Sequence, residues 1–430
     1  MVAADTPSPV DTQSAQELCD FIDASPSPFH VCETAAVMLE AGGFRRCDER
    51  NSLPGVGSHY VIRGGALVAW RAGEELSSFR LIGAHTDSPN LRVKPNPDVT
   101  RAGYQQLAVE VYGGPLLNSW LDRDLGLSGR VAVRGASGIE IRLLRIDEPL
   151  LRIPQLAIHL DREINEKGLL LNKQTHLSPF WALDSSATAF LDVISAAVAS
   201  EPQDVLSWDV MVHPLEPSRI VGVRGEFVSA PRIDNQLSCW AGLSALLACP
   251  VRPGIAQAVV LFDHEEVGST SERGADGAFL GSILERIATS CGLGRAEYLT
   301  AVANSFCVSA DCAHATNPNY ADRHEPSHQI LLNGGPVLKV NTNLRYATDA
   351  ASAAVFAEAC RSAGVPCQRF VNRTDLACGS TIGPLTAAML SMPTVDVGAP
   401  QLAMHSAREL CGSVDPGYLL AALNAYLSDF

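Results

Sequence analysis

Four ionisable side chains follow one another directly after an apolar run of this 430-residue sequence. The segment "FDHEEVGS", residues 262–269, comes after "AQAVVLF", which is typical of a buried strand. Adjacent carboxylates repel each other, and burying them is costly unless a positive group lies between them. Glu265 and Glu266 therefore point to a cation at the end of this strand.

Further acidic and histidine side chains stand just past other predicted strands. In a sheet covered by helices on both faces, ligands bind outside the carboxyl ends of the strands. We therefore expect these side chains to converge at one edge of one sheet. The residues in such positions are His85, Asp87, Asp234, Glu265, Glu266, Asp311, His314 and His405.

Imidazole and carboxylate ligands without a thiolate suit divalent zinc, manganese or cobalt. If five of these side chains bind two ions, one carboxylate must bridge the ions. Two ions bridged in this way lie ~3.5–4 Å apart and together orient a water molecule and polarise a carbonyl. A remaining carboxylate would accept the proton of that water and pass it to the leaving group. Two adjacent glutamates can serve one site only if the strand has ended in a turn, which Gly268 permits.

Each candidate also has a purely structural explanation when it is taken alone. His85 and Asp87 fit a surface turn, and Asp234 and Asp311 fit capping residues. Two consecutive glutamates also fit the first turn of an exposed helix. The joint placement of these residues at strand ends is what favours a functional site.

A second segment, "HEPSH" at residues 324–328, matches the H-E-x-x-H pattern of single-zinc peptidases. That pattern requires a helix, and Pro326 between the two histidines costs ~3 kcal/mol inside one. We therefore expect no zinc site there. The sequence also contains no phosphate-binding loop and no nucleophilic serine elbow.

The order of predicted elements indicates an α/β fold with a mostly parallel sheet flanked by helices. Two helices are expected over 12–42, followed by short strands up to residue 85. Residues 99–218 contain short alternating strands with Gly turns, and strands alternate with helices again after residue 219. We predict a catalytic domain made of 1–98 and 219–430, interrupted by an inserted β-rich domain of 99–218.

Composition narrows the class of protein. The chain is 47% hydrophobic and 18% charged, with a net charge of −15 that argues against nucleic acid and anionic membranes as partners. An acidic ligand would need a local positive site. No apolar stretch is long enough to span a membrane, and the first residues do not fit a secretory signal. The twelve cysteines lack a C-x-x-C pair, so we expect reduced thiols in a cytoplasmic protein.

Seven blocks of sequence, in order, closely resemble the aspartyl aminopeptidases. This resemblance implies a metallo-aminopeptidase/phosphorylase-like α/β fold, and an enzyme that removes N-terminal Asp or Glu from peptides. The blocks are "GAHTDSPNLRVK", "RIDNQ", "DHEEVGSTSERGA", "SADCAHATNPNYADRHE", "GPVLKVNTNLRYATDA", "CGSTIGP" and "GAPQLAMHSARE".

The resemblance also implies a role for each residue that matches these blocks. Glu265 would be the general base and then the general acid, and Asp87 would orient His85. Two divalent ions are implied, with zinc as the first choice and manganese or cobalt as alternatives. The implied ligands are His85, Asp234 and Asp311 for one ion, and Asp234, Glu266 and His405 for the other.

Substrate contacts and assembly follow from the same resemblance. His314, Lys339 and Tyr346 match substrate-contacting positions, and the Lys339 ammonium can neutralise an acidic substrate side chain. The inserted domain is implied to be a dimerisation domain within a tetrahedral dodecamer. His159 resembles a histidine that reaches the active site of a neighbouring subunit.

Three alternatives remain open at this point. The first is an aminopeptidase with the same metals but broader or neutral specificity. The second is a catalytically silent, self-assembling homologue, against which Glu265 argues because a scaffold needs no proton acceptor. The third is a nucleotide-binding α/β protein, which the missing phosphate loop disfavours.

Overall fold

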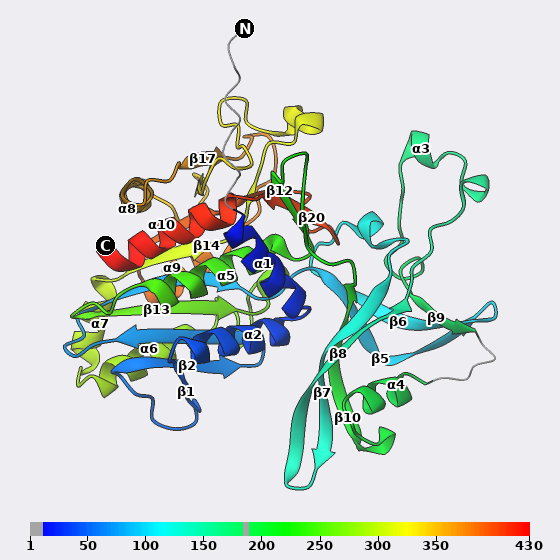
Figure 1. Cartoon of the computed structure of the whole chain (residues 1–430), viewed down its shortest axis with the longest axis horizontal. Helices are drawn as coiled ribbons and strands as arrows, with labels where there is room; N and C mark the ends of the chain where they lie inside the picture. Colours follow the sequence, from blue (N-terminus) through cyan, green and yellow to red (C-terminus); the bar gives the residue numbers. More distant parts are fainter. Residues whose placement is uncertain (1–11, 184–188) are drawn as a thin grey trace.

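The computed structural model of the chain describes residues 12–183 and 189–430. The sequence analysis found no secretory signal in the first residues of the chain. Residues 1–11 lie outside the described range. The described residues form three sheets, with helices packed around the largest one (Figure 1). No helix among them is long and apolar enough to cross a membrane.

The largest sheet has nine strands and is mixed. Its centre, β13-β4-β14-β18, is parallel, whereas β2–β3, β3–β13 and β16–β18 pair antiparallel. The prediction of a mostly parallel sheet is therefore not confirmed. One reason is that only two residues connect β2 to β3, which is too few for a parallel crossover. The strands, in spatial order, are β1 (Arg45–Arg46), β2 (Gly57–Arg63), β3 (Ala66–Ala72), β13 (Ile255–Phe262), β4 (Ser78–His85), β14 (Phe306–Ala310), β18 (Thr394–Gly398), β16 (Val337–Val340) and β17 (Gln368–Val371).

Helices cover both faces of this sheet (Figure 1). Alternate residues of β3 pack into two separate apolar cores, with Leu67 and Ala69 in one and Val68 and Trp70 in the other, as the period of two requires. The first core includes α1 (Gln13–Ala24), α2 (Pro28–Ala41), α5 (Ile233–Ala248), α8 (Ala350–Ser362) and α10 (Asp415–Asp429). The second includes α6 (Phe279–Ser290), α7 (Arg295–Ala303) and the start of α9 (Ile382–Leu390).

The two predicted N-terminal helices are confirmed as α1 and α2. Ser27 begins α2, because its Oγ accepts the backbone N–H of His30 and Pro28 occupies the first helical position. The helices after residue 219, where strands and helices are expected to alternate, are α5 to α10.

The β-rich character predicted for the insertion is confirmed. A six-stranded sheet with its own apolar core lies beside the large sheet (Figure 1), and all its neighbouring strands are antiparallel. The domain boundaries stay a prediction, and β5 already begins at Asn90. The strands, in spatial order, are β8 (Gly138–Leu151), β7 (Leu125–Gly135), β10 (Val205–Pro214), β5 (Asn90–Arg101), β6 (Tyr104–Tyr112) and β9 (Phe180–Leu183), and the insertion also holds α3 (Ile164–Lys167) and α4 (Phe190–Ala197).

A third, five-stranded sheet was missed by the sequence reasoning. Its strands are two to four residues long and come from three separate segments of the chain, so no local periodicity marks them. In spatial order they are β11 (Arg219–Val221), β12 (Phe227–Ala230), β20 (Glu409–Gly412), β19 (Pro400–Leu402) and β15 (Ala313–His314).

Candidate metal centre

The ends of three neighbouring parallel strands meet at one edge of the large sheet. His85 is the last residue of β4 and pairs with Phe262, the last residue of β13. Asp311 directly follows β14, which pairs with β4 on its other side. The predicted convergence of these strand ends is thus present in the structure.

Two further candidate residues reach this edge from the five-stranded sheet. Asp234 lies in the first turn of α5, which follows β12, and His405 lies between β19 and β20. Asp234 does not have helical backbone dihedral angles, and Arg232 before it has a positive φ of 56°. The backbone therefore turns sharply at this point before the regular helix begins.

These residues form two overlapping groups whose ligand atoms lie within 4.8 Å of one another. The first group is His85, Asp234 and Asp311, and the second is Asp234, Glu266 and His405. Asp234 belongs to both groups. A third combination, His85 with Glu265 and Glu266, occupies the same place.

Distances within the two groups suit nitrogen and oxygen ligands around a cation. His85 Nε2 lies 3.4 Å from Asp234 Oδ1 and 3.7 Å from Asp311 Oδ1. His405 Nε2 lies 3.3 Å from Asp234 Oδ2 and 3.4 Å from Glu266 Oε2. Asp234 Oδ1 and Glu266 Oε1 are buried without a hydrogen-bond partner among the described residues, as expected for oxygens that bind a metal. The donor set therefore fits divalent metal ions.

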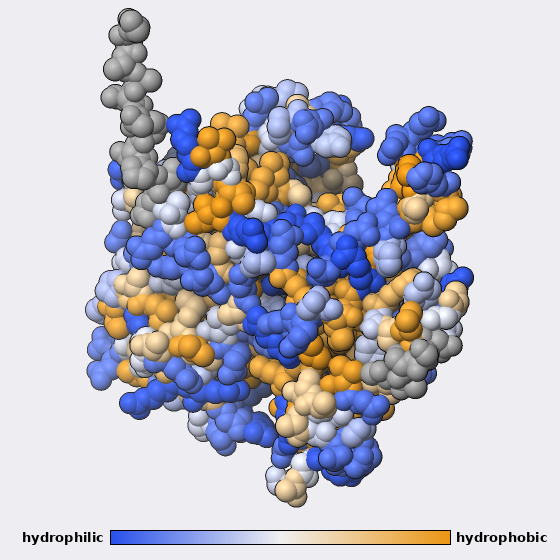
Figure 2. Space-filling model, turned by 45° about the vertical axis from the view of Figure 1, so that its right-hand side comes forward, coloured by the Kyte–Doolittle hydropathy of each residue, from blue (hydrophilic) through white to orange (hydrophobic). Residues whose placement is uncertain are grey.

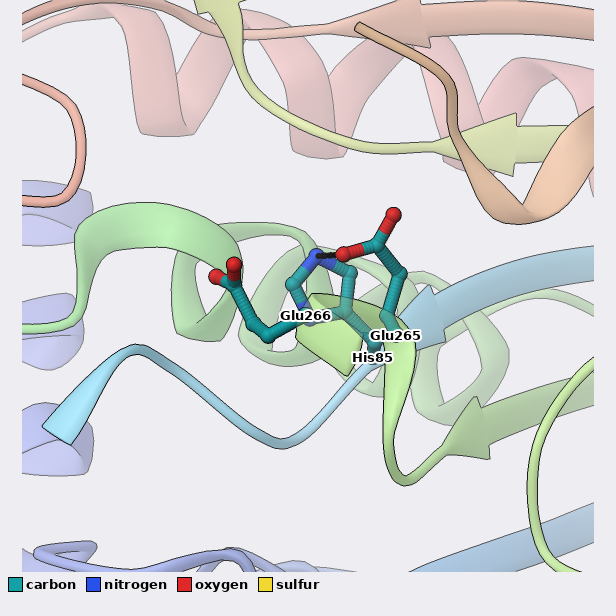
Figure 3. A group of neighbouring side chains, drawn as sticks. All are labelled: His85, Glu265 and Glu266. Carbon is teal, nitrogen blue, oxygen red and sulfur yellow. Dashed lines mark ion pairs between the residues drawn. The ribbon is translucent and has the colours of Figure 1, made fainter. Parts of the chain in front are cut away.

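The two adjacent glutamates serve one site because the chain turns immediately after β13. His264 and Gly268, with φ of 67° and 98°, flank a short 3-10 turn over Glu265–Val267. In Figure 3, Glu265 and Glu266 lie on opposite sides of His85. Glu265 Oε2 is 4.0 Å from His85 Nε2, while Glu266 faces the second group.

Asp87 is fully buried, and its carboxylate holds this turn in place. It accepts the backbone N–H groups of Glu265 and Glu266, both at 3.1 Å, and the hydroxyl of Tyr112 at 2.7 Å. His85 Nδ1 is closer to the Asp87 backbone oxygen, at 3.0 Å, than to its carboxylate, at 3.5 Å. Sequence reasoning missed Tyr112, which comes from β6 of the insertion.

Burial of several carboxylates together sets the electrostatics of the site. Desolvation raises the pKa of Glu265 to about 8, against the opposing effect of His85. Burial, followed by the nearby Asp234, also raises the pKa of Glu266. Divalent cations would offset this surplus of negative charge.

Lys339 is a buried residue, 2% exposed, and not a surface lysine. Its Nζ donates to the carbonyl oxygen of Cys312 at 3.0 Å and lies 3.8 Å from Asp311 Oδ2. The same nitrogen is 5.3 Å from the ring centre of Tyr346, which is also buried. Lys339 and Tyr346 therefore adjoin the first group.

The two remaining histidines lie in different places. His314 ends β15, and its ring lies 6.1 Å from that of Phe370. His159 is exposed in a short 3-10 helix, Ile158–Leu160, of the insertion and belongs to none of the groups formed by the described residues.

The "HEPSH" segment is not helical, which agrees with the expectation drawn from Pro326. His324 has extended backbone angles after the 3-10 helix Pro318–Arg323, and its Nε2 accepts the backbone N–H of Asn317. The two histidines of this segment belong to no metal-binding group among the described residues.

The large mixed sheet carries overlapping histidine–carboxylate groups at the ends of its parallel strands, with a further glutamate beside them. Such a site is typical of a metal-dependent hydrolase. The chain belongs to the M18 family of aminopeptidases. The family model "Aminopeptidase I zinc metalloprotease (M18)" matches residues 21–427. This confirms the family that the seven sequence blocks indicate.

Relatives and solved structures cover nearly the whole chain. "Probable M18 family aminopeptidase 2" of Mycobacterium leprae is 52% identical over 422 residues, which are 96% of this chain and 98% of that protein. The "Cryo-EM structure of the Ape4 and Nbr1 complex" matches with a TM-score of 0.92 and 36% identity, over 96% of this chain and 85% of that one. The dodecamer of mApe1 from S. cerevisiae matches with a TM-score of 0.84 and 29% identity, over 96% of both chains.

Proposed function

We propose that this M18 aminopeptidase uses two divalent metal ions to remove N-terminal Asp or Glu from peptides, with zinc as the first choice of metal. The observation that carries the proposal is the pair of ligand groups that share Asp234, with Glu265 beside them. His85, Asp234 and Asp311 would hold one ion, and Asp234, Glu266 and His405 the other. Bound ions of this kind lower the pKa of a water molecule and polarise the scissile carbonyl.

The side chains of the protein supply the proton transfers. Glu265 accepts the proton of the attacking water and then donates it to the leaving amine. Its position next to His85, outside the two ligand groups that share Asp234, supports this role. Asp87 holds the backbone of both glutamates, so that the base and the ligand keep their separate directions.

Acidic specificity is the finer part of the proposal. In a chain with a net charge of −15, the Lys339 ammonium is a positive group beside the ligand cluster. It would pair with the substrate carboxylate, with Tyr346 and His314 completing the contacts. An aminopeptidase of broader or neutral specificity has the same ligands and is distinguished only by its substrates.

We also propose a homo-oligomer, and specifically a tetrahedral dodecamer, in which His159 reaches a neighbouring active site. Similarity to the mApe1 dodecamer supports this. Leu160 and Leu170, 75% and 90% exposed, flank α3 on a segment that projects from the insertion (Figure 1). Figure 2 shows further hydrophobic residues at the surface among hydrophilic ones. A cytoplasmic location stays a prediction.

The test is hydrolysis of Asp-, Glu-, Leu- and Ala-initiated chromogenic amides after chelation, and again after zinc, manganese or cobalt is added back. Activity that the metal restores only on Asp and Glu substrates is the expected result. Restored activity on Leu or Ala would support the broader aminopeptidase. No activity with any metal would support the catalytically silent homologue.

A further inference from the structure

Glu409 touches two of the candidate ligand residues through their backbone rather than their side chains. It is the first residue of β20, where it pairs with Ala230, and it is 2% exposed. Its Oε1 accepts the N–H of His405 at 2.6 Å, and its Oε2 accepts the N–H of Asp234 at 3.0 Å. One carboxylate therefore spans both residues.

Both N–H groups lie where regular structure cannot satisfy them. Asp234 is in the first turn of α5, whose N–H groups have no partner within the helix. His405 has a φ of 68°, in the segment between β19 and β20. A carboxylate is suited to this place because each of its two oxygens accepts a hydrogen bond.

The two residues that Glu409 joins belong to the same ligand group. His405 Nε2 lies 3.3 Å from Asp234 Oδ2, and a change in either backbone would alter this separation. We propose that Glu409 is a positioning residue that sets the geometry of the Asp234–Glu266–His405 group and hence its affinity for a metal ion. The inference rests on the proposed metal centre.

The other ligand group depends less on this contact. His85, Asp234 and Asp311 share only Asp234 with the pair that Glu409 spans. Loss of the contact should therefore weaken one of the two ions more than the other. Residues that orient metal ligands typically change metal affinity by 10- to 100-fold when they are replaced.

Two substitutions separate the span of Glu409 from its charge. Glu409→Gln keeps the length but replaces one acceptor oxygen with an amide donor, so one of the two N–H groups loses its partner. Glu409→Asp keeps the charge and both acceptors but is one methylene shorter. Both variants should bind the second ion more weakly if the span matters.

Asp415 offers a matched control elsewhere in the fold. It is fully buried in α10, and its two oxygens accept the N–H groups of Asn333 and Gly335, at 2.7 and 3.0 Å. It belongs to none of the ligand groups among the described residues. Asp415→Asn therefore removes the same kind of contact away from the candidate ligands.

The experiment measures zinc binding by the full-length protein, through elemental analysis after dialysis at fixed free zinc and competition with a chromophoric chelator. We expect two ions per subunit in the wild type and in Asp415→Asn. In Glu409→Gln and Glu409→Asp, we expect one tightly held ion and a second bound at least about tenfold more weakly. Circular dichroism establishes that each variant is folded.

Different results would overturn different claims. Unchanged affinity for both ions in the folded Glu409 variants would overturn the positioning role, and so would an equal loss in Asp415→Asn. Loss in Glu409→Gln together with normal affinity in Glu409→Asp would show that the length of the side chain is not required, which also overturns the inference. A wild type that binds no zinc, manganese or cobalt would contradict the proposed metal centre itself.

Discussion

Asp234 belongs to both candidate ligand groups, so its surroundings affect the whole site. Burial opposes its charged form, but the imidazoles of His405 and His85 beside it hold its pKa below the usual range for an aspartate. The carboxylate is therefore ionised at neutral pH, which is the form that binds a metal.

Glu265 is the residue whose replacement should affect proton transfer most directly. Glu265→Gln keeps the shape of the side chain but cannot accept a proton, so we expect kcat to fall by about 100- to 10,000-fold. Zinc content should stay unchanged, since the two ligand groups that share Asp234 remain intact. Steady-state kinetics and elemental analysis test this. Glu272 is exposed, and Glu272→Gln serves as the control. Retained turnover in Glu265→Gln would contradict the mechanism.

Lys339 is the residue on which acidic specificity should depend. Lys339→Met fills a similar volume without a positive charge, so we expect the ratio of kcat/KM for Asp over Leu substrates to fall by at least about tenfold. Metal content must be measured in parallel, because Asp311 lies 3.8 Å from the Lys339 ammonium. An unchanged ratio in the metal-loaded variant would remove Lys339 from the specificity pocket.

At the scale of elements, the small five-stranded sheet brings distant segments to the metal site. Ala230 pairs with Glu409, and Ala313 pairs with Pro400, so the ends of β12, β15 and β19 lie together. Asp234 and His405 follow two of these strands, and Asp311 precedes the third. This short sheet and the large sheet together determine where the candidate ligands meet.

Helix α2 should make the stability of the fold sensitive to mild acid. Burial lowers the pKa of His30 to about 4, and Ser27 Oγ lies 2.7 Å from its Nδ1. Between pH 6.5 and 4 the unfolded chain binds a proton at this residue and the folded chain does not, so stability falls as pH decreases through this range. We expect the wild type to lose about 2 kcal/mol from this residue between pH 7 and 5.

Replacing His30 tests this expectation directly. His30→Gln cannot titrate in this range, so its free energy of unfolding should fall less between pH 7 and 5 than that of the wild type. Denaturant titrations of both proteins at the two pH values give the difference. Equal losses in both proteins would assign the acid sensitivity to other groups.

At the scale of the whole molecule, one part of the insertion contributes to the candidate site, and another part projects from the fold. Tyr112 of β6 bonds to Asp87, and His405 Nδ1 lies 3.1 Å from the backbone oxygen of Gly114. The segment around α3 projects from the six-stranded sheet (Figure 1), and Leu160 and Leu170 beside this helix are exposed. The insertion can therefore connect the proposed assembly to the active site.

A charge in the projecting segment should weaken the proposed assembly. Leu170 is 90% exposed, and Leu170→Asp would place an unpaired charge in an apolar contact between subunits. We expect a lower assembly mass by mass photometry and a lower kcat, because His159 would no longer reach its neighbour. Val223→Asp, at a 99% exposed apolar residue of the catalytic part, is the control. A full-size assembly with normal activity would contradict the proposed role of this segment.

Local sequence determined much of the fold, including α1, α2, the central strands and the β-rich insertion. It also placed His85, Glu265 and Asp311 at strand ends, because apolar runs that end in acidic or histidine residues are visible without knowledge of the partner strands. The turn after β13 was equally predictable, since Gly268 stands at the position with φ of 98°.

Only the tertiary structure decided which distant segments meet. The strand order of the large sheet, the strand pairing of the five-stranded sheet, and the contacts of Tyr112 and Glu409 all bring together separate segments of the chain. Periodicity reports whether a residue faces the core, but it carries no information about the segment across from it. For this reason the sequence identified the candidate ligands, and the fold revealed the residues that hold them in place.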